Sequence, residues 1–179
     1  MSTVPTVPTV GFPSTATRPN NTICIDHNGE RLTGHDDAGG LLAGYLCYRT
    51  GTTQANDFTV AIDEHPGLVA TWHQLYAVEI PVSDIHQAYN YCDGAYAEND
   101  PIVVVKIEIG KKYWLKVAGL TIVEDTLYNP VGGTIGFIDD PAPDAIEGWT
   151  HGFVALAYAT TLTGWMPFTY VGIIPLDTT

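Results

Sequence analysis

The sequence predicts an all-β fold, a β-barrel or sandwich of short antiparallel strands with an extended N-terminal arm and at most one short helix. Its 179 residues include 18 glycines and 12 prolines, which interrupt regular structure too often for a helical bundle. Short apolar segments recur about every 8 to 12 residues between turn residues, as they do in barrels and sandwiches. Helical periodicity is confined to one short stretch.

The chain divides into an arm, residues 1–22, and a β domain, residues 23–179. The arm repeats Thr-Val-Pro units with almost no charge. Proline fixes φ and removes amide donors, so the segment is expected to be extended and to form no core of its own. A linker is one interpretation. We expect instead an arm that docks on a neighbouring protein, because no domain is expected ahead of it, with Val4, Val7, Val10 and Phe12 as its apolar contacts.

The first half of the β domain contains three expected strands. They are residues 41–48, which end at the polar turn 49–53, and residues 58–62 and 75–80, which Pro66-Gly67 separates.

One short helix is expected between the two halves, from Ser83 to Cys92. Ser83 can cap it, and apolar residues follow at the i, i+3, i+4 and i+7 positions of one helical face (Ile85, Ala88, Tyr89 and Cys92).

The second half opens with the clearest alternation in the chain. Val105, Ile107 and Ile109 fall on one face of an expected strand, with two charged residues on the other. Residues 110–112 read as a turn, and 113–117 as the returning strand of a hairpin. With Tyr113, Leu115 and Val117 inward, Trp114 points outward. The remaining expected strands are 120–123, 134–138, 153–158 and 168–174.

Charge and composition exclude several classes of partner. Lys and Arg total 7 and Asp and Glu total 20, which gives a formal net charge of −13. Nucleic-acid affinity depends largely on Lys and Arg, so we expect no nucleic acid and no anionic membrane as partners. Neither a signal peptide nor an apolar run of about 18 residues is recognisable, so the chain is expected to stay in a cytoplasm. The three cysteines lack a C-x-x-C spacing and are expected to be buried thiols.

Motifs for catalysis are absent from the sequence. Walker A, G-x-S-x-G, H-E-x-x-H and dinucleotide glycine patterns do not occur, so we expect neither an enzyme nor a cofactor. Asp26-His27-Asn28-Gly29 with His35-Asp36-Asp37 could surround a cation, and the acidic stretch 139–147 could bind calcium. Turns and solvated loops use the same residues. We therefore expect no metal site.

Aromatic residues are more informative about surfaces. Four tryptophans accompany ten tyrosines, and such side chains serve cores, subunit interfaces and sugar stacking. Trp114, Trp165 and Tyr170 are the expected interface residues, although core positions are the commoner role for aromatic residues in small β domains.

Several segments together resemble the head decoration, or cement, proteins of tailed phages, a group of small β-barrel capsid-associated proteins. The resemblance covers roughly residues 45–174 after the uncharged arm. The segments that carry it are glycine turns and apolar strands at residues 38–45, 98–105, 111–117, 133–137 and 152–157.

The resemblance implies a structural virion protein that binds the capsid exterior and stabilises it by bridging major capsid protein subunits. It also implies a homotrimer, assembled in the host cytoplasm. A second hypothesis is a carbohydrate-binding or adhesive β module of a tail, fibre or cell surface, which would use exposed Trp and Tyr side chains and acidic loops for calcium.

Overall fold

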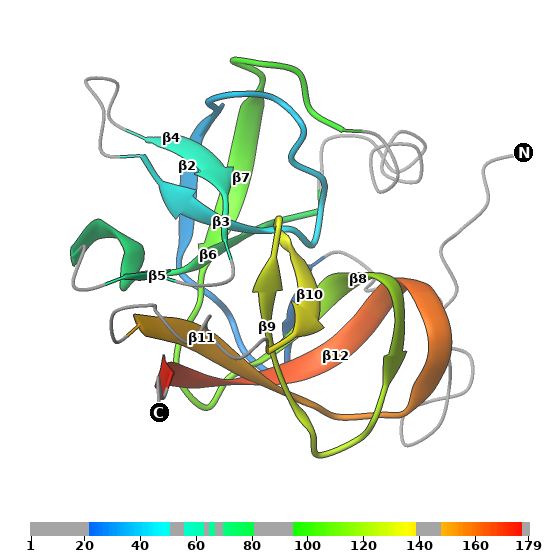
Figure 1. Cartoon of the computed structure of the whole chain (residues 1–179). Helices are drawn as coiled ribbons and strands as arrows, with labels where there is room; N and C mark the ends of the chain where they lie inside the picture. Colours follow the sequence, from blue (N-terminus) through cyan, green and yellow to red (C-terminus); the bar gives the residue numbers. More distant parts are fainter. Residues whose placement is uncertain are drawn as a thin grey trace, which may run out of the picture.

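The computed structural model describes residues 22–50, 56–62, 65–66, 70–80, 95–138 and 148–176. Within these ranges the regular structure is almost entirely β, which confirms the expected fold class (Figure 1). The elements are β1 (Cys24–Ile25), β2 (Arg31–Asp36), β3 (Leu46–Arg49), β4 (Asp57–Val60), β5 (His65–Pro66), the 3₁₀ turn η1 (Ala70–Trp72), β6 (Tyr76–Val78), β7 (Pro101–Lys106), β8 (Lys112–Ile122), β9 (Leu127–Val131), β10 (Thr134–Phe137), β11 (Gly148–Ala155) and β12 (Ala159–Leu176).

The first ring is a closed barrel with the strand order β2-β4-β3-β6-β7. Its strands pair in antiparallel fashion except for β2 and β4, which are parallel. Alternate residues of β7 show why the barrel forms: Ile102 and Val104 are buried in its core, whereas Val103 between them is 37% exposed. Phe58 and Val78 pack into the same core.

The second ring follows from β8 onward. β8 pairs with β10, β10 with β9, β9 with β11, β11 with β12, and β12 returns to β8. Two short strands from the first half of the chain extend this sheet, since β1 pairs with β8 and β5 pairs with β11. Tyr113, Leu115, Tyr128, Phe153 and Phe168 fill its interior and are at most 1% exposed.

The rings pack on each other and share one hydrophobic cluster, which includes Leu46 and Val105 from the first ring. The turn between β9 and β10 is hydrogen-bonded into the first ring: Gly133 N–H donates to the Ala61 carbonyl, and Leu46 N–H donates to the Gly133 carbonyl. Gly133 has φ +85°, and a Cβ there would lie 2.7 Å from the Tyr45 ring. The chain therefore forms two closed rings where the sequence predicted one barrel or sandwich.

The expected hairpin across residues 105–117 is wrong. β7 ends at Lys106, and Lys112 of β8 pairs with Thr169 of β12, so the two strands belong to different rings. Ile109, expected on the same face as Val105 and Ile107, is 71% exposed, whereas those two side chains are buried. The alternation that predicted a strand over 105–109 lies where the chain crosses from one ring to the other.

Two other expectations concern segments outside the described residues: the helix from Ser83 to Cys92, and all of the arm before Thr22. In the part of the chain that the structure covers, no helix reaches the length and apolarity needed to cross a bilayer.

Candidate functional site at the base of the N-terminal segment

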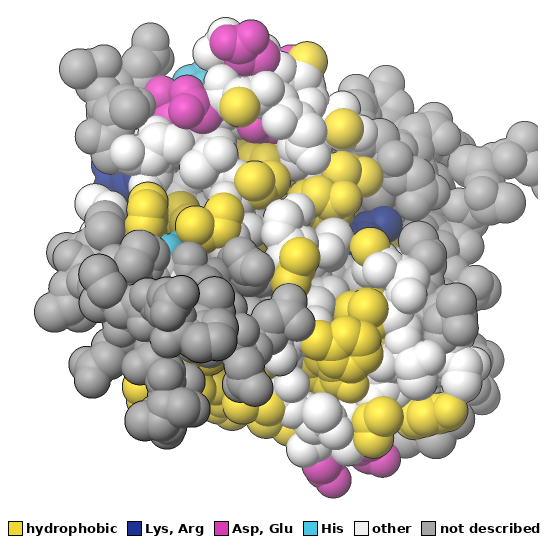
Figure 2. All heavy atoms as spheres, viewed as in Figure 1, with side chains coloured by type: hydrophobic (Ala, Val, Ile, Leu, Met, Phe, Trp, Pro, Cys, Tyr) yellow, Lys and Arg dark blue, Asp and Glu magenta, His cyan; other side chains and the backbone are white. Residues whose placement is uncertain are grey.

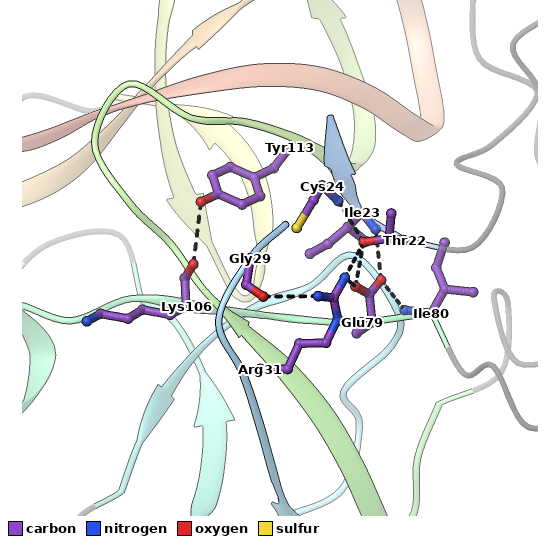
Figure 3. Close-up of polar contacts among 9 residues, drawn as sticks. All are labelled: Thr22, Ile23, Cys24, Gly29, Arg31, Glu79, Ile80, Lys106 and Tyr113. Carbon is purple, nitrogen blue, oxygen red and sulfur yellow. Dashed lines mark hydrogen bonds and ion pairs between the residues drawn. The ribbon is translucent and has the colours of Figure 1, made fainter. Parts of the chain in front are cut away.

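The described chain begins at Thr22, and residues 22–25 lie between the two rings (Figure 3). β1 joins the second ring through the register pairs Cys24 with Tyr113 and Ile25 with Lys112. The Trp114 N–H also donates to the Ile23 carbonyl at 2.8 Å. The main chain that leads out of the expected arm is therefore part of a sheet as soon as it enters the domain.

Glu79 holds the same residues from the first ring. It follows β6, and its side chain is 2% exposed. Oε1 accepts the backbone N–H groups of Ile23 and Ile80, both at 2.8 Å. Oε2 accepts the Thr22 hydroxyl at 2.6 Å and the Arg31 Nη2 at 2.9 Å. Four donors thus satisfy one buried carboxylate, which is the condition under which a buried charge is tolerated.

Arg31 completes this arrangement, which we call the Glu79 clamp (Thr22, Ile23, Arg31 and Glu79). It begins β2, and its side chain is 37% exposed. Nη2 also donates to the Thr22 hydroxyl at 2.8 Å, and Nη1 donates to the Gly29 carbonyl at 3.0 Å. Removing one partner of such a pair leaves the other charge buried and uncompensated, which is strongly destabilising. The clamp fixes the position and direction of the chain at Thr22.

The side chains next to the clamp are held in their protonated forms. Burial raises the pKa of the Cys24 thiol, and burial also raises the pKa of Tyr113 to about 12. The Tyr113 hydroxyl accepts the Glu108 N–H at 3.0 Å and donates to the Lys106 carbonyl at 3.4 Å, which links β8 to the end of β7. These groups therefore serve as neutral links between the rings.

The arm residues expected to contact a partner, Val4, Val7, Val10 and Phe12, lie outside the described residues. The clamp shows where the segment that carries them joins the domain.

The expected interface residues lie in the core. Trp114 is 9% exposed, Trp165 0% and Tyr170 4%. Trp114 was expected to point outward, but the outer face of β8 is covered as well: Gly44 of the first ring contacts the Trp165 ring, and the Lys116 ammonium lies 4.8 Å from the centre of that ring. These side chains have little surface to offer a second subunit or a sugar in this conformation.

The residues with metal-type side chains near Asp26 and Asp36 form turns. The Asp36 carboxylate accepts the N–H groups of Gly39 and Leu41, both at 2.9 Å, and His27 Nδ1 lies 2.8 Å from the Ile25 carbonyl. In the described ranges, no group of three or more His, Cys, Asp or Glu side chains is arranged so that it could hold a metal ion. The acidic stretch 139–147 lies outside them. Cys24 and Cys47 are free, buried thiols, as expected, and Cys92 also lies outside.

Sequence reasoning did not identify Glu79 as a functional residue. One signal was present: the glutamate is the sole charged residue in the expected strand 75–80. A charged residue among buried ones needs a partner. The identity of that partner, Arg31, depends on pairings between distant strands.

Comparison with known proteins gives a partial likeness to a solved structure. No protein-family model matches the chain, and no curated protein matches it. Among solved structures, the chain is similar to one described as "The crystal structure of head fiber gp8.5 N base in bacteriophage phi29", with a TM-score of 0.44 and 14% sequence identity, over 80% of this chain and 94% of that chain.

Proposed function

We propose that this chain is a structural protein of a phage-type virion that binds the outside of the capsid and stabilises it by bridging major capsid protein subunits. The observation that carries the proposal is the Glu79 clamp, which ties the origin of a Pro/Val/Thr segment to both rings. The resemblance of residues 45–174 to head decoration proteins supports the same function.

The arm is the proposed contact with the capsid. In both rings the strands pair around a closed circuit, so the rings offer little free edge to a partner. An extended segment can instead add to an exposed strand edge on the capsid, with Val4, Val7, Val10 and Phe12 filling apolar pockets. A fixed base improves binding because fewer residues lose conformational freedom when the arm docks. Binding to the assembled shell alone then stabilises that shell by mass action.

The charge of the domain fits a position on the outside of a particle. On the face shown in Figure 2, acidic side chains lie at the top and at the bottom, and Lys and Arg side chains are sparse. A net charge of −13 keeps exposed subunits soluble and disfavours binding to nucleic acid. A homotrimer, assembled on the capsid in the host cytoplasm, remains part of the proposal.

Cosedimentation with purified capsids tests the arm. A variant with Val4, Val7, Val10 and Phe12 replaced by serine should fold normally and lose at least about tenfold in affinity, since each deeply buried apolar side chain contributes about 1.5 to 3 kcal/mol. Thr3→Ser with Thr6→Ser and Thr9→Ser is the matched control and should bind like the wild type. Full affinity of the quadruple variant would exclude the arm as the main contact.

A further inference from the structure

A second polar contact joins the rings away from the Glu79 clamp. After β4 the chain leaves the first ring, and β5 pairs with β11 of the second ring through His65 with Trp149. η1 follows before the chain returns to the first ring as β6. The side chains that meet here, which we call the histidine joint, are Tyr48, His65, Trp72, Trp149, His151 and Tyr170.

His151 lies at the centre of the joint and is fully buried. Its Nε2 is 2.8 Å from the Trp72 carbonyl, and its Nδ1 is 2.8 Å from the Tyr170 hydroxyl. Because a carbonyl can only accept, Nε2 carries the proton, and Nδ1 of the neutral ring accepts from Tyr170. The neutral ring therefore satisfies both neighbours. A second proton, on Nδ1, would remove the acceptor of the Tyr170 hydroxyl and place a charge inside the joint.

His65 extends the same arrangement toward the first ring. It is 1% exposed, and its Nε2 lies 2.5 Å from the Tyr48 hydroxyl of β3. Its ring centre is 4.3 Å from that of Trp149, 4.8 Å from that of Trp72 and 6.3 Å from that of His151. Two buried imidazoles are thus close enough for the charge on one to oppose the charge on the other.

Among the described residues, the groups that face His151 provide no negative charge for an imidazolium. They are Tyr48 from β3, His65 from β5, Trp72 of η1 with His73 just after it, and Tyr170 from β12. The pKa of His151 is lowered to about 4: burial is the main cause, the hydrogen bond to the Trp72 carbonyl opposes it, and His65 and His73 add to the lowering. Burial raises the pKa of Tyr170 to about 12, so its hydroxyl remains a donor.

We propose that the histidine joint is an acid-sensitive contact: in its neutral form it holds the two rings together, and protonation opens it while each ring stays closed. The Trp72–His151 hydrogen bond and the pairing of β5 with β11 join the segment between β4 and β6 to the second ring and belong to neither closed circuit, so the joint can open without breaking either ring. A histidine with a lowered pKa contributes stability above its ordinary pKa of about 6.5, and this stability is lost as pH falls toward 4. The inference does not depend on the proposed capsid function.

Hydrogen–deuterium exchange of the full chain, corrected for the intrinsic pH dependence of exchange, tests the joint. Between pH 6.5 and 4.5, peptides that contain His65, Trp72 or His151 should lose at least about tenfold in protection. Peptides from β2 and β7 should keep theirs. Unchanged protection of the joint at pH 4.5 would overturn the proposal.

A non-titrating variant separates protonation of the joint from general acid unfolding. In His151→Gln the amide can donate to the Trp72 carbonyl and accept from Tyr170, so the loss of protection should be clearly smaller than in the wild type. His35→Gln, at a half-exposed site of the first ring, is the matched control and should respond like the wild type. The proposal is also overturned if His151→Gln shows the full wild-type loss.

If His151→Gln does not fold, Tyr170→Phe gives a second test. It removes the donor that favours the neutral imidazole, so protonation becomes easier and the joint should open at higher pH than in the wild type. An unchanged or lower opening pH would contradict the role given to His151.

Discussion

The Glu79 clamp and the histidine joint, two of the polar contacts between the rings, satisfy buried groups in opposite ways. The Glu79 clamp contains a charge and surrounds it with four donors, one of them a guanidinium. The histidine joint contains groups that could be charged and holds His151 neutral between a carbonyl and a hydroxyl. The stability contributed by a buried, fully hydrogen-bonded charge depends on each of its partners. The stability contributed by a buried neutral histidine depends on the pH. Mutation should therefore affect the first contact most, and acid the second.

Glu79→Ala is expected to have the largest effect. It removes the acceptor of two backbone N–H groups, the Thr22 hydroxyl and Arg31. Loss of one member of a buried, hydrogen-bonded pair typically lowers the free energy of unfolding by about 3 to 5 kcal/mol. The loss should be smaller here because Arg31 is partly exposed and water can hydrate its guanidinium.

Denaturant titration measures that loss, and Glu30→Ala is its control. Glu30 is 62% exposed and lies 3.7 Å from Lys106, so its removal should change the free energy of unfolding by less than about 1 kcal/mol. Equal losses in the two variants would show that the clamp is no stronger than a surface ion pair.

Lowering the pH is expected to have the next largest effect on the free energy of unfolding, because it protonates the histidine joint. A shift in the pKa of His151 from 6.5 to about 4 corresponds to up to about 3 kcal/mol of stability, present above pH 6.5 and lost as pH falls toward 4. The free energy of unfolding of the wild type should fall more steeply over this range than that of His151→Gln. Parallel pH profiles would mean that His151 does not titrate in the folded chain.

Gly133→Ala tests a third contact, in which the β9–β10 turn of the second ring is hydrogen-bonded to the first ring. The new Cβ would collide with the Tyr45 ring at a residue with positive φ, so we expect a loss of about 2 kcal/mol. Gly132→Ala is the matched control: it also has positive φ, but no atom lies within 4 Å of the new Cβ. Thermal unfolding of the two variants isolates the collision, and identical losses would show that Tyr45 moves aside freely.

The fold class could be predicted from the sequence because turns and short apolar runs are local signals. Segments such as 58–62 and 134–138 fall close to β4 and β10 for this reason. The hairpin at 105–117 could not be predicted correctly, because a turn between two strands does not say whether the strands pair.

The candidate site was less predictable because its residues are buried by segments that are distant in the sequence. Both faces of β8 are covered over residues 113–117, so Trp114 and Lys116 are buried although they alternate with Tyr113, Leu115 and Val117. Alternation distinguishes two faces only when one of them meets water. His65 and His151 come together only through the pairing of β5 with β11, and their scatter along the sequence gave no sign of a cluster.

The short strands β1 and β5 have a consequence for the order in which the chain folds. All strands of the first ring precede Lys112, so this ring can close while the rest of the chain is still being synthesised. β1 and β5 belong to that early half but pair with β8 and β11, which emerge later. Until β8 and β11 have been synthesised, the backbone N–H and C=O groups of β1 and β5 lack their hydrogen-bond partners in the sheet. The second half of the chain therefore completes the strand pairing of the first half. A nascent chain that stopped after the first ring would expose two short strands to other proteins.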